Sequence, residues 1–222
     1  MKILTAPSIF AADLANMEKE VRRTELSGAD LIHFDIMDGV YVPNMSFGFD
    51  MLKAIRKLTQ LPIDAHMMTV HPEMYIQRLS ECGADIVTVH NDIAPEEQIK
   101  GMLESINSYG MMAGIALKPK VPAEAVLPFI DCVDMILVMT VEPGFSGQKF
   151  MDMSDKIREI KKYIGSRNIS IEVDGGIKAE TAPICAEAGA NVFVIGSAAY
   201  AAPSMKDAVE NVRSTAAAAY PG

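Results

Sequence analysis

The sequence has few cysteines and no tryptophan. Its three cysteines, Cys82, Cys132 and Cys185, are odd in number and far apart, with no CxxC pair. This pattern argues against a disulfide framework and against a zinc site built from paired cysteines. A thiol nucleophile or metal ligand is the alternative, but small core residues in a reducing compartment are favoured. The sequence therefore predicts a cytoplasmic protein.

An excess of positive charge is also missing. The formal net charge is −9 and the isoelectric point is about 4.9, whereas nucleic-acid binders usually carry a basic face. No apolar run approaches the length of a membrane span. The first residues, MKILTAPSIF, lack the long apolar stretch of a signal peptide. We therefore expect no nucleic-acid and no membrane partner, while backbone amides remain able to bind a phosphate.

Eight short apolar segments recur along the chain. Each has the length of a buried strand and is continuously apolar, as strands covered on both faces should be. The segments are KILTAPSI, DLIHFDIM, PIDAHMM, DIVTVH, MMAGIAL, DMILVMTV, ISIEVDG and NVFVIGS. Segments with helical spacing lie between them, and several end in Gly just before the next strand, as in GAD and GAN.

This alternation predicts a single (β/α)8 barrel, a TIM barrel, over residues 1–222. A doubly wound sheet is the competing fold, but its first strand is normally followed by a glycine-rich turn, and SIFAADLAN has no glycine. In a barrel the chemistry lies where strands end. The expected strand ends carry Ser8, Asp35, Asp38, His66, His90, Asn91, Lys118, Thr140, Glu142, Asp174, Gly196 and Ser197.

Four polar residues form a candidate metal site. His33, Asp35, His66 and Asp174 come from the second, third and seventh expected strands, and two imidazoles with two carboxylates suit a first-row divalent metal. Taken singly, each histidine would be a core residue and each aspartate a cap or ion-pair partner. Their convergence on one barrel mouth favours the metal.

Other polar residues near this set have plainer interpretations. Because side chains alternate along a strand, Asp64 and Glu172 are expected to face inward, as His33 and Asp35 are. They lie nearer the bottom of their strands and are interpreted as structural, as is His71 beyond the third strand. His90 closes the fourth strand and either orients substrate or fills the core. Three methionines recur at strand ends and are interpreted as a soft apolar floor beneath the metal rather than as plain core filler: Met37, Met68 and Met139.

Three glycine turns follow neighbouring strands: PGFSGQ at 143–148, DGG at 174–176 and GS at 196–197. Glycine lets backbone N–H groups approach a ligand closely, and loops after the seventh and eighth strands often bind phosphate in barrels. A single turn of this kind is not specific for a ligand, because glycine also ends ordinary strands. Together they predict a phosphate site made mostly of backbone contacts, because the turns carry no arginine.

Longer motifs run through nearly the whole chain: APSIFAADLANM, HFDIMDGVYVPN, DAHMM, VMTVEPGFSGQKFM, EVDGGI and AGANVFVIGSA. Together they resemble the ribulose-phosphate 3-epimerase family. The resemblance implies one divalent metal ion (zinc, iron, manganese or cobalt) bound by His33, Asp35, His66 and Asp174, with Asp35 and Asp174 as the acid–base pair. It also implies substrate contacts at Ser8, His66, Gly144, Phe145, Ser146, Gly147, Gly175, Gly176, Gly196 and Ser197.

The implied activity converts D-ribulose 5-phosphate to D-xylulose 5-phosphate, a step of the pentose phosphate pathway. Asp35 would remove a proton from one face of C3 and Asp174 would return one to the other, while the metal stabilises the enediolate. Val40 replaces the usual His of DGHFVPN, Asn91 follows His90 where a Glu is commonly near, and Ser146 replaces a frequent Gly. Val40 and Asn91 leave open a ketohexose substrate such as allulose 6-phosphate.

Two other functions are weaker readings of the same residues. A phosphate-sugar decarboxylase would need DxKxxD where the third strand has DAHMM. A non-catalytic phosphate-binding barrel would be expected to lose an acid or a ligand, and all four are present. The sequence does not determine the oligomeric state, but a closed homo-oligomer is the expectation.

Overall fold

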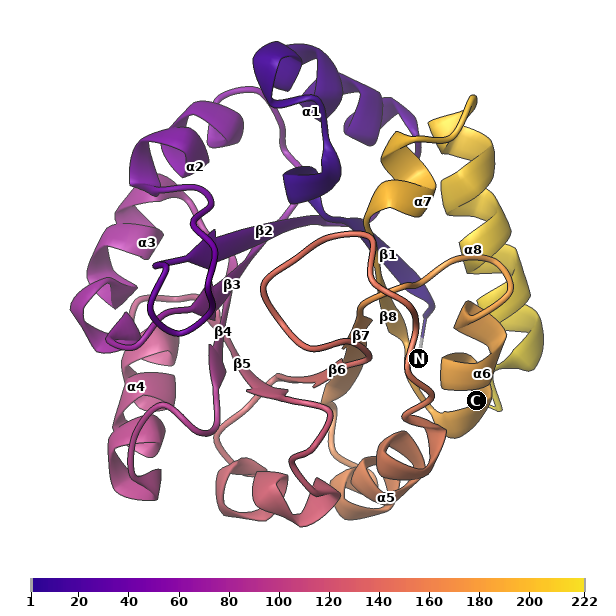
Figure 1. Ribbon diagram of the computed structural model, residues 1–222. Coiled ribbons are helices and arrows are strands. Elements are labelled where there is room, and N and C mark those ends of the chain that lie inside the picture. The colour runs from indigo at the N-terminus through magenta and orange to yellow at the C-terminus, as the bar shows by residue number, and fades with distance from the viewer. Residues whose placement is uncertain (1, 222) are drawn as a thin grey trace.

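The computed structural model describes residues 2–221. Within that range eight parallel strands are hydrogen-bonded in the order β1-β8-β7-β6-β5-β4-β3-β2, and one parallel bridge between Ser8 and His33 joins the two ends. The predicted barrel is confirmed (Figure 1). The strands are β1 Leu4–Pro7, β2 Ile32–Met37, β3 Ile63–Met68, β4 Ile86–His90, β5 Met112–Leu117, β6 Met135–Met139, β7 Ser170–Asp174 and β8 Val192–Ile195.

The helices form a ring outside the strands (Figure 1). Helices α3 and α6 are each followed by a glycine, Gly83 and Gly189, as the GAD and GAN motifs predicted. The α-helices are α1 Met17–Leu26, α2 Phe49–Arg56, α3 Ile76–Cys82, α4 Glu96–Ser108, α5 Ser154–Ile164, α6 Ala182–Ala188, α7 Ser197–Tyr200 and α8 Met205–Ala219. Short 3-10 helices are η1 Ile9–Ala11, η2 Leu14–Asn16, η3 Pro72–Met74 and η4 Ala123–Phe129.

The connection from β5 to β6 departs from the regular pattern. It is the 3-10 helix η4 rather than an α-helix, and Pro128 lies inside it. Proline has no backbone N–H to donate and its ring crowds the preceding turn, so this segment cannot continue as an α-helix. The barrel is still covered here, because Val126 and Phe129 are buried against it.

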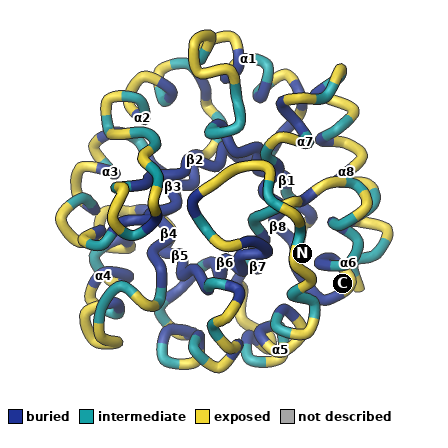
Figure 2. Tube along the Cα trace, in the orientation of Figure 1, coloured by how far each residue is buried: buried dark blue, intermediate teal, exposed yellow. Residues whose placement is uncertain are grey.

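The core has an outer and an inner part. The outer part lies between the sheet and the apolar faces of the helices, and it explains why strands are dark blue and outer helix faces yellow in Figure 2. The inner part lies inside the barrel, toward the end where the strands begin. It consists of small and medium apolar side chains, among them Ala6, Ile86, Met135 and Val192. One end of the barrel is therefore apolar and closed, which leaves the other end for polar side chains.

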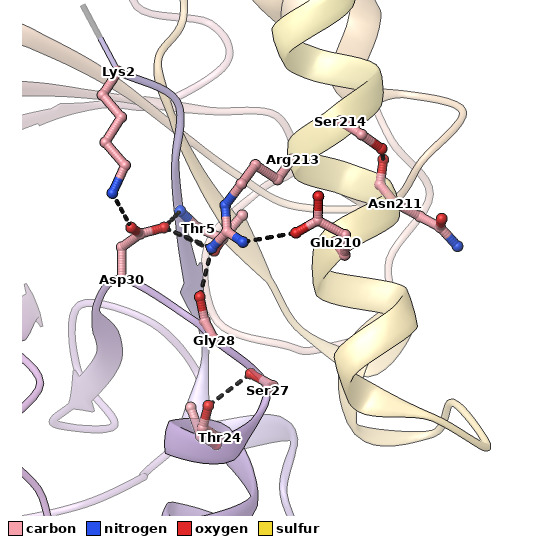
Figure 3. A network of polar contacts seen from close by, with 10 residues as sticks. All are labelled: Lys2, Thr5, Thr24, Ser27, Gly28, Asp30, Glu210, Asn211, Arg213 and Ser214. Atoms are coloured by element: carbon pink, nitrogen blue, oxygen red, sulfur yellow. Dashed lines mark hydrogen bonds and ion pairs between the residues drawn. The ribbon is translucent and has the colours of Figure 1, made fainter.

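A polar network ties the last helix to the first strand (Figure 3). The Arg213 guanidinium of α8 donates to Asp30 at 2.9 Å, to the Thr5 hydroxyl at 2.9 Å and to the Gly28 carbonyl at 2.6 Å. Asp30 also accepts from the Thr5 amide and from Lys2. Because Thr5 is in β1 and Asp30 precedes β2, this network reinforces the seam that a single bridge closes.

Connecting loops cover the end of the barrel at which the strands finish. The longest of these, between β6 and α5, passes over the barrel opening in Figure 1. It is held to the β2–α2 connection by a hydrogen bond from the side-chain amide of Asn44 (Nδ2) to the Gly144 carbonyl at 2.8 Å. Within the described residues, no helix has the length and apolar content needed to cross a bilayer.

Candidate active site

The strand register brings the predicted metal residues together. His33 and Asp35 share the inner face of β2, because side chains alternate along a strand, and Asp35 is paired with His66 of β3. Asp174 ends β7 on the same side of the barrel. One ligand atom from each of the four residues lies within 4.8 Å of the others. The geometry therefore fits the metal site that the sequence predicted.

The two histidines present free nitrogen atoms to this cluster. His33 Nε2 and His66 Nδ1 each lie 3.4 Å from Asp35 Oδ1. Both nitrogens are buried, and neither has a hydrogen-bond partner within residues 2–221. A buried polar atom without a partner is costly. Two unpartnered nitrogens facing carboxylates make a donor set that a divalent cation would satisfy.

The charges around His33 favour a cation at Nε2. Its Nδ1 lies 2.7 Å from Asp64 Oδ2, so the ring is held between two carboxylates. Burial opposes a charge on the ring, but Asp35 and Asp64 outweigh it and hold the pKa of His33 well above its ordinary value. The same carboxylates would stabilise a metal ion in place of that proton.

The two aspartates differ strongly in acidity. Burial opposes ionisation of Asp35, but His33 and His66 outweigh it and hold its pKa well below the usual range. Burial, joined by repulsion from Asp35 and Asp64, raises the pKa of Asp174 to about 6. Asp35 is therefore ionised at neutral pH, whereas the pKa of Asp174 is close enough to neutrality for this carboxyl to gain and lose a proton there. This is the separation that paired acid–base chemistry requires.

Two serines fix the position of Asp35. The Ser8 hydroxyl donates to Asp35 Oδ2 at 2.6 Å, and the Ser46 hydroxyl donates to the Asp35 backbone carbonyl at 2.6 Å. Ser46 also accepts a hydrogen bond from the Met37 amide. The Asp35 carboxylate is thus held by Ser8, and the Asp35 backbone is held by Ser46. The Ser8 hydroxyl hydrogen is already used in this bond to Asp35.

A cavity of about 470 Å³ opens above the cluster, a volume suited to a small molecule. Asp35 and Asp174 line it from strands that are separated around the barrel by β1 and β8, so they face its contents from different directions. Its wall includes Ser8, the three methionines of the predicted floor and the residues of the three glycine turns that were predicted to contact substrate: Met37, Met68, Met139, Gly144, Phe145, Ser146, Gly147, Gly175, Gly176, Gly196 and Ser197.

The turn after β7 requires its second glycine. A Cβ built on Gly176 would lie 2.8 Å from the Phe150 backbone nitrogen, and its φ is +64°. A side chain there would push against the β6–α5 loop and adopt a left-handed conformation that L-residues avoid. The turns after β6 and β7 consequently pack backbone to backbone at the edge of the cavity.

Some predicted residues lie away from the cavity wall. His66 is fully buried and touches the cluster without lining the cavity, so its predicted contact with substrate stays a prediction. Asp38 accepts backbone hydrogen bonds from its own loop and from Val70. His71 is exposed and pairs with Glu73, in line with its structural interpretation. Val40 is 73% exposed.

Three further polar residues lie against the two predicted histidine ligands. Asp64 orients His33, and Glu172 lies just beyond, with Oε1 3.6 Å from His33 Nδ1. Burial and the charge of Asp64 raise the pKa of Glu172 to about 8. His90 contacts His66, and burial, with the charges of His66 and Lys118, holds its pKa well below the ordinary value. Inward parity indicated Asp64 and Glu172, but nothing in the sequence revealed which histidine each contacts.

Comparison with known proteins gives one consistent result. The model of the ribulose-phosphate 3-epimerase family matches residues 4–200. The Bacillus subtilis ribulose-phosphate 3-epimerase is 41% identical over 215 residues, covering 95% of this chain and 98% of its own. The Rhodobacter capsulatus enzyme of the same name is 43% identical over 198 residues, covering 89% and 86%.

Solved structures with lower identity share the fold alone. The 3-hexulose-6-phosphate synthase from Salmonella typhimurium superposes with a TM-score of 0.74, covering 99% of this chain and all of its own, at 19% identity. The orotidine 5'-phosphate decarboxylase from Pyrococcus horikoshii has a TM-score of 0.72 at 13% identity, covering 96% of this chain and 99% of its own. At such identities the likeness identifies the barrel architecture and no particular chemistry.

Proposed function

The chain belongs to the ribulose-phosphate 3-epimerase family, and from this we propose that it interconverts D-ribulose 5-phosphate and D-xylulose 5-phosphate. It is an enzyme of the isomerase class. The observation that carries the mechanistic part of the proposal is the pair Asp35 and Asp174. Both line one cavity, and their pKa values are displaced in opposite directions.

Proton transfer at C3 is assigned to these two carboxylates. In the direction from ribulose 5-phosphate, ionised Asp35 accepts the C3 proton, and the C–H electrons move toward the C2 carbonyl to give an enediolate. Protonated Asp174 then donates a proton to C3 from the opposite face, which inverts the carbon. Solvent restores the two protonation states, and the roles exchange in the reverse direction. Ser8 holds the Asp35 carboxylate during the transfer.

His33, Asp35, His66 and Asp174 would hold one divalent metal ion, with Asp64 orienting His33. When bound, that ion supplies Lewis-acid stabilisation of the negative charge that develops on substrate oxygens. The donor set suits zinc, iron, manganese or cobalt, and it does not select among them.

The glycine turns after β6, β7 and β8 are assigned to the phosphate group. They lie side by side on the wall of the same cavity that the two aspartates line. Backbone N–H groups at such turns suit a phosphate. Fixing the phosphate there would position C3 between the aspartates, so binding energy remote from the reaction would align it.

A pentulose phosphate is proposed over a hexulose phosphate. Val40 and Asn91 were the departures that left room for allulose 6-phosphate, but within residues 2–221 neither is part of the cavity wall. Val40 instead faces solvent. Its smaller side chain consequently adds no space around a ligand.

The test is kcat/KM for both sugar phosphates on one metal-loaded preparation. One extra carbon changes binding by only ~1–3 kcal/mol, so activity with both sugars is expected. The ratio of the two specificity constants therefore identifies the preferred substrate. We expect ribulose 5-phosphate to be preferred, with deuterium from solvent entering C3. A preference for allulose 6-phosphate would overturn the substrate assignment but keep the mechanism. Absence of epimerisation with both sugars, in protein of verified metal content, would overturn the activity.

Three further assignments complete the proposal. The whole chain, residues 1–222, acts as one catalytic domain, supported by one continuous sheet that α8 ties to β1. A cytoplasmic location is supported by three free thiols. A homo-oligomer is supported by apolar side chains exposed on neighbouring loops at the barrel mouth, namely Val40, Met45 and Met74.

A further inference from the structure

The two ring nitrogens of His66 face different groups. Nδ1 is directed at Asp35 Oδ1, 3.4 Å away, within the candidate metal cluster. Nε2 lies 2.9 Å from Nε2 of His90, the last residue of β4. His66 therefore bridges the cluster and a second buried histidine, and the nitrogen left for a metal depends on the proton between the two rings.

Binding of a metal at His66 Nδ1 determines which nitrogens of the two rings carry protons. Two nitrogens 2.9 Å apart form a hydrogen bond only when one of them carries the shared proton. If Nδ1 of His66 donates its lone pair to a cation, the proton of the neutral ring must be on Nε2. His90 Nε2 must then be the acceptor, so His90 carries its own proton on Nδ1.

The His90 ring is held in a position from which its Nε2 can accept this hydrogen bond. It is fully buried and stacks on His66, with ring centroids 5.0 Å apart and an interplanar angle of 28°. The ring of Tyr41 also lies against it, 4.9 Å away between centroids. His90 Nδ1 has no hydrogen-bond partner in the part of the chain that the structure describes, so packing and the bond to His66 set its position.

Tyr41 is itself anchored by two charged side chains. Its hydroxyl donates to Asp92 Oδ1 at 2.6 Å, and Lys118 Nζ lies 4.0 Å from the centre of its ring. Lys118 also pairs with Asp92 at 2.9 Å. The ring that covers His90 is thus fixed from three elements: the β2–α2 loop, the end of β4 and the end of β5.

We propose that His90 is a positioning residue that accepts the Nε2–H of His66 and thereby presents the His66 Nδ1 lone pair to the metal. This inference rests on the metal site of the proposed function. Partners of this kind, which accept the free N–H of a ligating histidine, orient the ring and raise its basicity. His33 has such a partner in Asp64, and His90 gives His66 a neutral counterpart.

The first experiment reads the tautomers directly. Long-range proton–nitrogen NMR of histidine-labelled, zinc-loaded enzyme should show His66 protonated on Nε2 and His90 neutral and protonated on Nδ1. The chain has only four histidines, and the exposed His71 serves as the reference. A His90 ring protonated on Nε2, or charged, would overturn the proposal.

The second experiment measures metal affinity in matched variants. His90→Leu removes the acceptor, and we expect zinc affinity, measured by competition with a chromophoric chelator, to fall roughly 10–100-fold. His90→Gln offers an amide oxygen instead and should stay within about threefold of wild type. His71→Gln is the control and should leave affinity unchanged. Wild-type affinity in folded His90→Leu, or an equal loss in both His90 variants, would contradict the proposal.

The two experiments separate this inference from the proposed function. Wild-type enzyme that binds zinc but has the wrong His90 tautomer would remove the role of His90 and leave the metal site intact. Wild-type enzyme that binds neither zinc nor another divalent ion would remove the metal site and the role of His90 together. If His90→Leu fails to fold, the NMR measurement on wild type still decides.

Discussion

Ser8 and Asp35 are joined by a 2.6 Å hydrogen bond at the point where the barrel closes. Ser8 pairs with His33 through the single bridge between the first two strands, so the seam of the barrel and the candidate catalytic carboxylate share one contact. A barrel that closed in another register would separate the hydroxyl from the carboxylate. Closure of the fold and the arrangement of the site are therefore linked.

Ser8→Ala should impair catalysis without loss of the fold. A hydrogen bond to a charged group contributes about 1.5 kcal/mol or more, which corresponds to roughly a tenfold fall in kcat. Because Ser8 stabilises ionised Asp35, its loss should raise the pKa of that carboxyl and move the acid limb of the pH–rate profile to higher pH. Ser46→Ala leaves the carboxylate bond in place and is the control. An unmoved acid limb in Ser8→Ala would remove this role.

Asp35→Asn and Asp174→Asn should each lose epimerisation by a factor of at least ~10²–10⁴. Each variant keeps the acid–base group on one face of C3. We therefore expect it to exchange the C3 hydrogen of one epimer with solvent deuterium without inverting it, and the two variants to act on opposite epimers. Both residues are also proposed ligands, so metal content is measured beside the rate. Epimerisation retained in either variant would exclude that aspartate as the acid–base group.

Metal binding should strengthen as pH rises through neutrality. Burial opposes a charge on the His33 ring, but Asp35 and Asp64 outweigh it and hold the pKa of His33 well above the ordinary histidine value of 6.5, so a proton still competes with the metal where an ordinary histidine would be neutral. Isothermal titration with zinc between pH 6.5 and 8 should show the dissociation constant falling as protons become scarcer, with proton release on binding. A dissociation constant that is independent of pH over this range would contradict the metal site at His33.

Gly176→Ala should weaken substrate binding, and Gly101→Ala should not. At Gly176 the added Cβ would meet the Phe150 backbone at 2.8 Å in a left-handed conformation, so the phosphate turn must distort at a cost of about 1–2 kcal/mol. We expect KM to rise about tenfold. Gly101 lies within α4, where a Cβ meets nothing within 4 Å, and alanine there should stabilise the fold by about 0.5–1 kcal/mol. An unchanged KM in Gly176→Ala would argue against this turn as the phosphate site.

Asp30→Asn should destabilise the seam at the other end of the barrel. Burial opposes its charge, but bonds from Lys2, Thr5 and Arg213 outweigh burial and hold the pKa of Asp30 below its ordinary value. Its contribution is therefore complete above the unfolded pKa of about 3.9 and is lost as pH falls through the lower folded value. Urea unfolding at pH 7 should show a loss of about 2 kcal/mol, shrinking below pH 4. Equal stability of variant and wild type at pH 7 would contradict this.

Local sequence pattern is enough to predict the barrel and the side chains that are available to its site. Apolar runs of strand length alternating with helical segments recur eight times, and this repetition is local information. Strand periodicity is local too, so it correctly assigned His33 with Asp35, and Asp64 with His66, to the inner face. The exception is the segment before β6, where Pro128 and its surroundings form a 3-10 helix.

The burial of each polar group and the partner that it contacts depend instead on long-range packing. His66 and His90 come from different strands, and their contact depends on the register of β3, β4 and the Tyr41 loop together. The opposite pKa displacements of Asp35 and Asp174 depend in the same way on charges contributed by other strands. Burial and electrostatic interaction are properties of atoms brought together by long-range packing, whereas local sequence pattern encodes only the face on which a side chain lies.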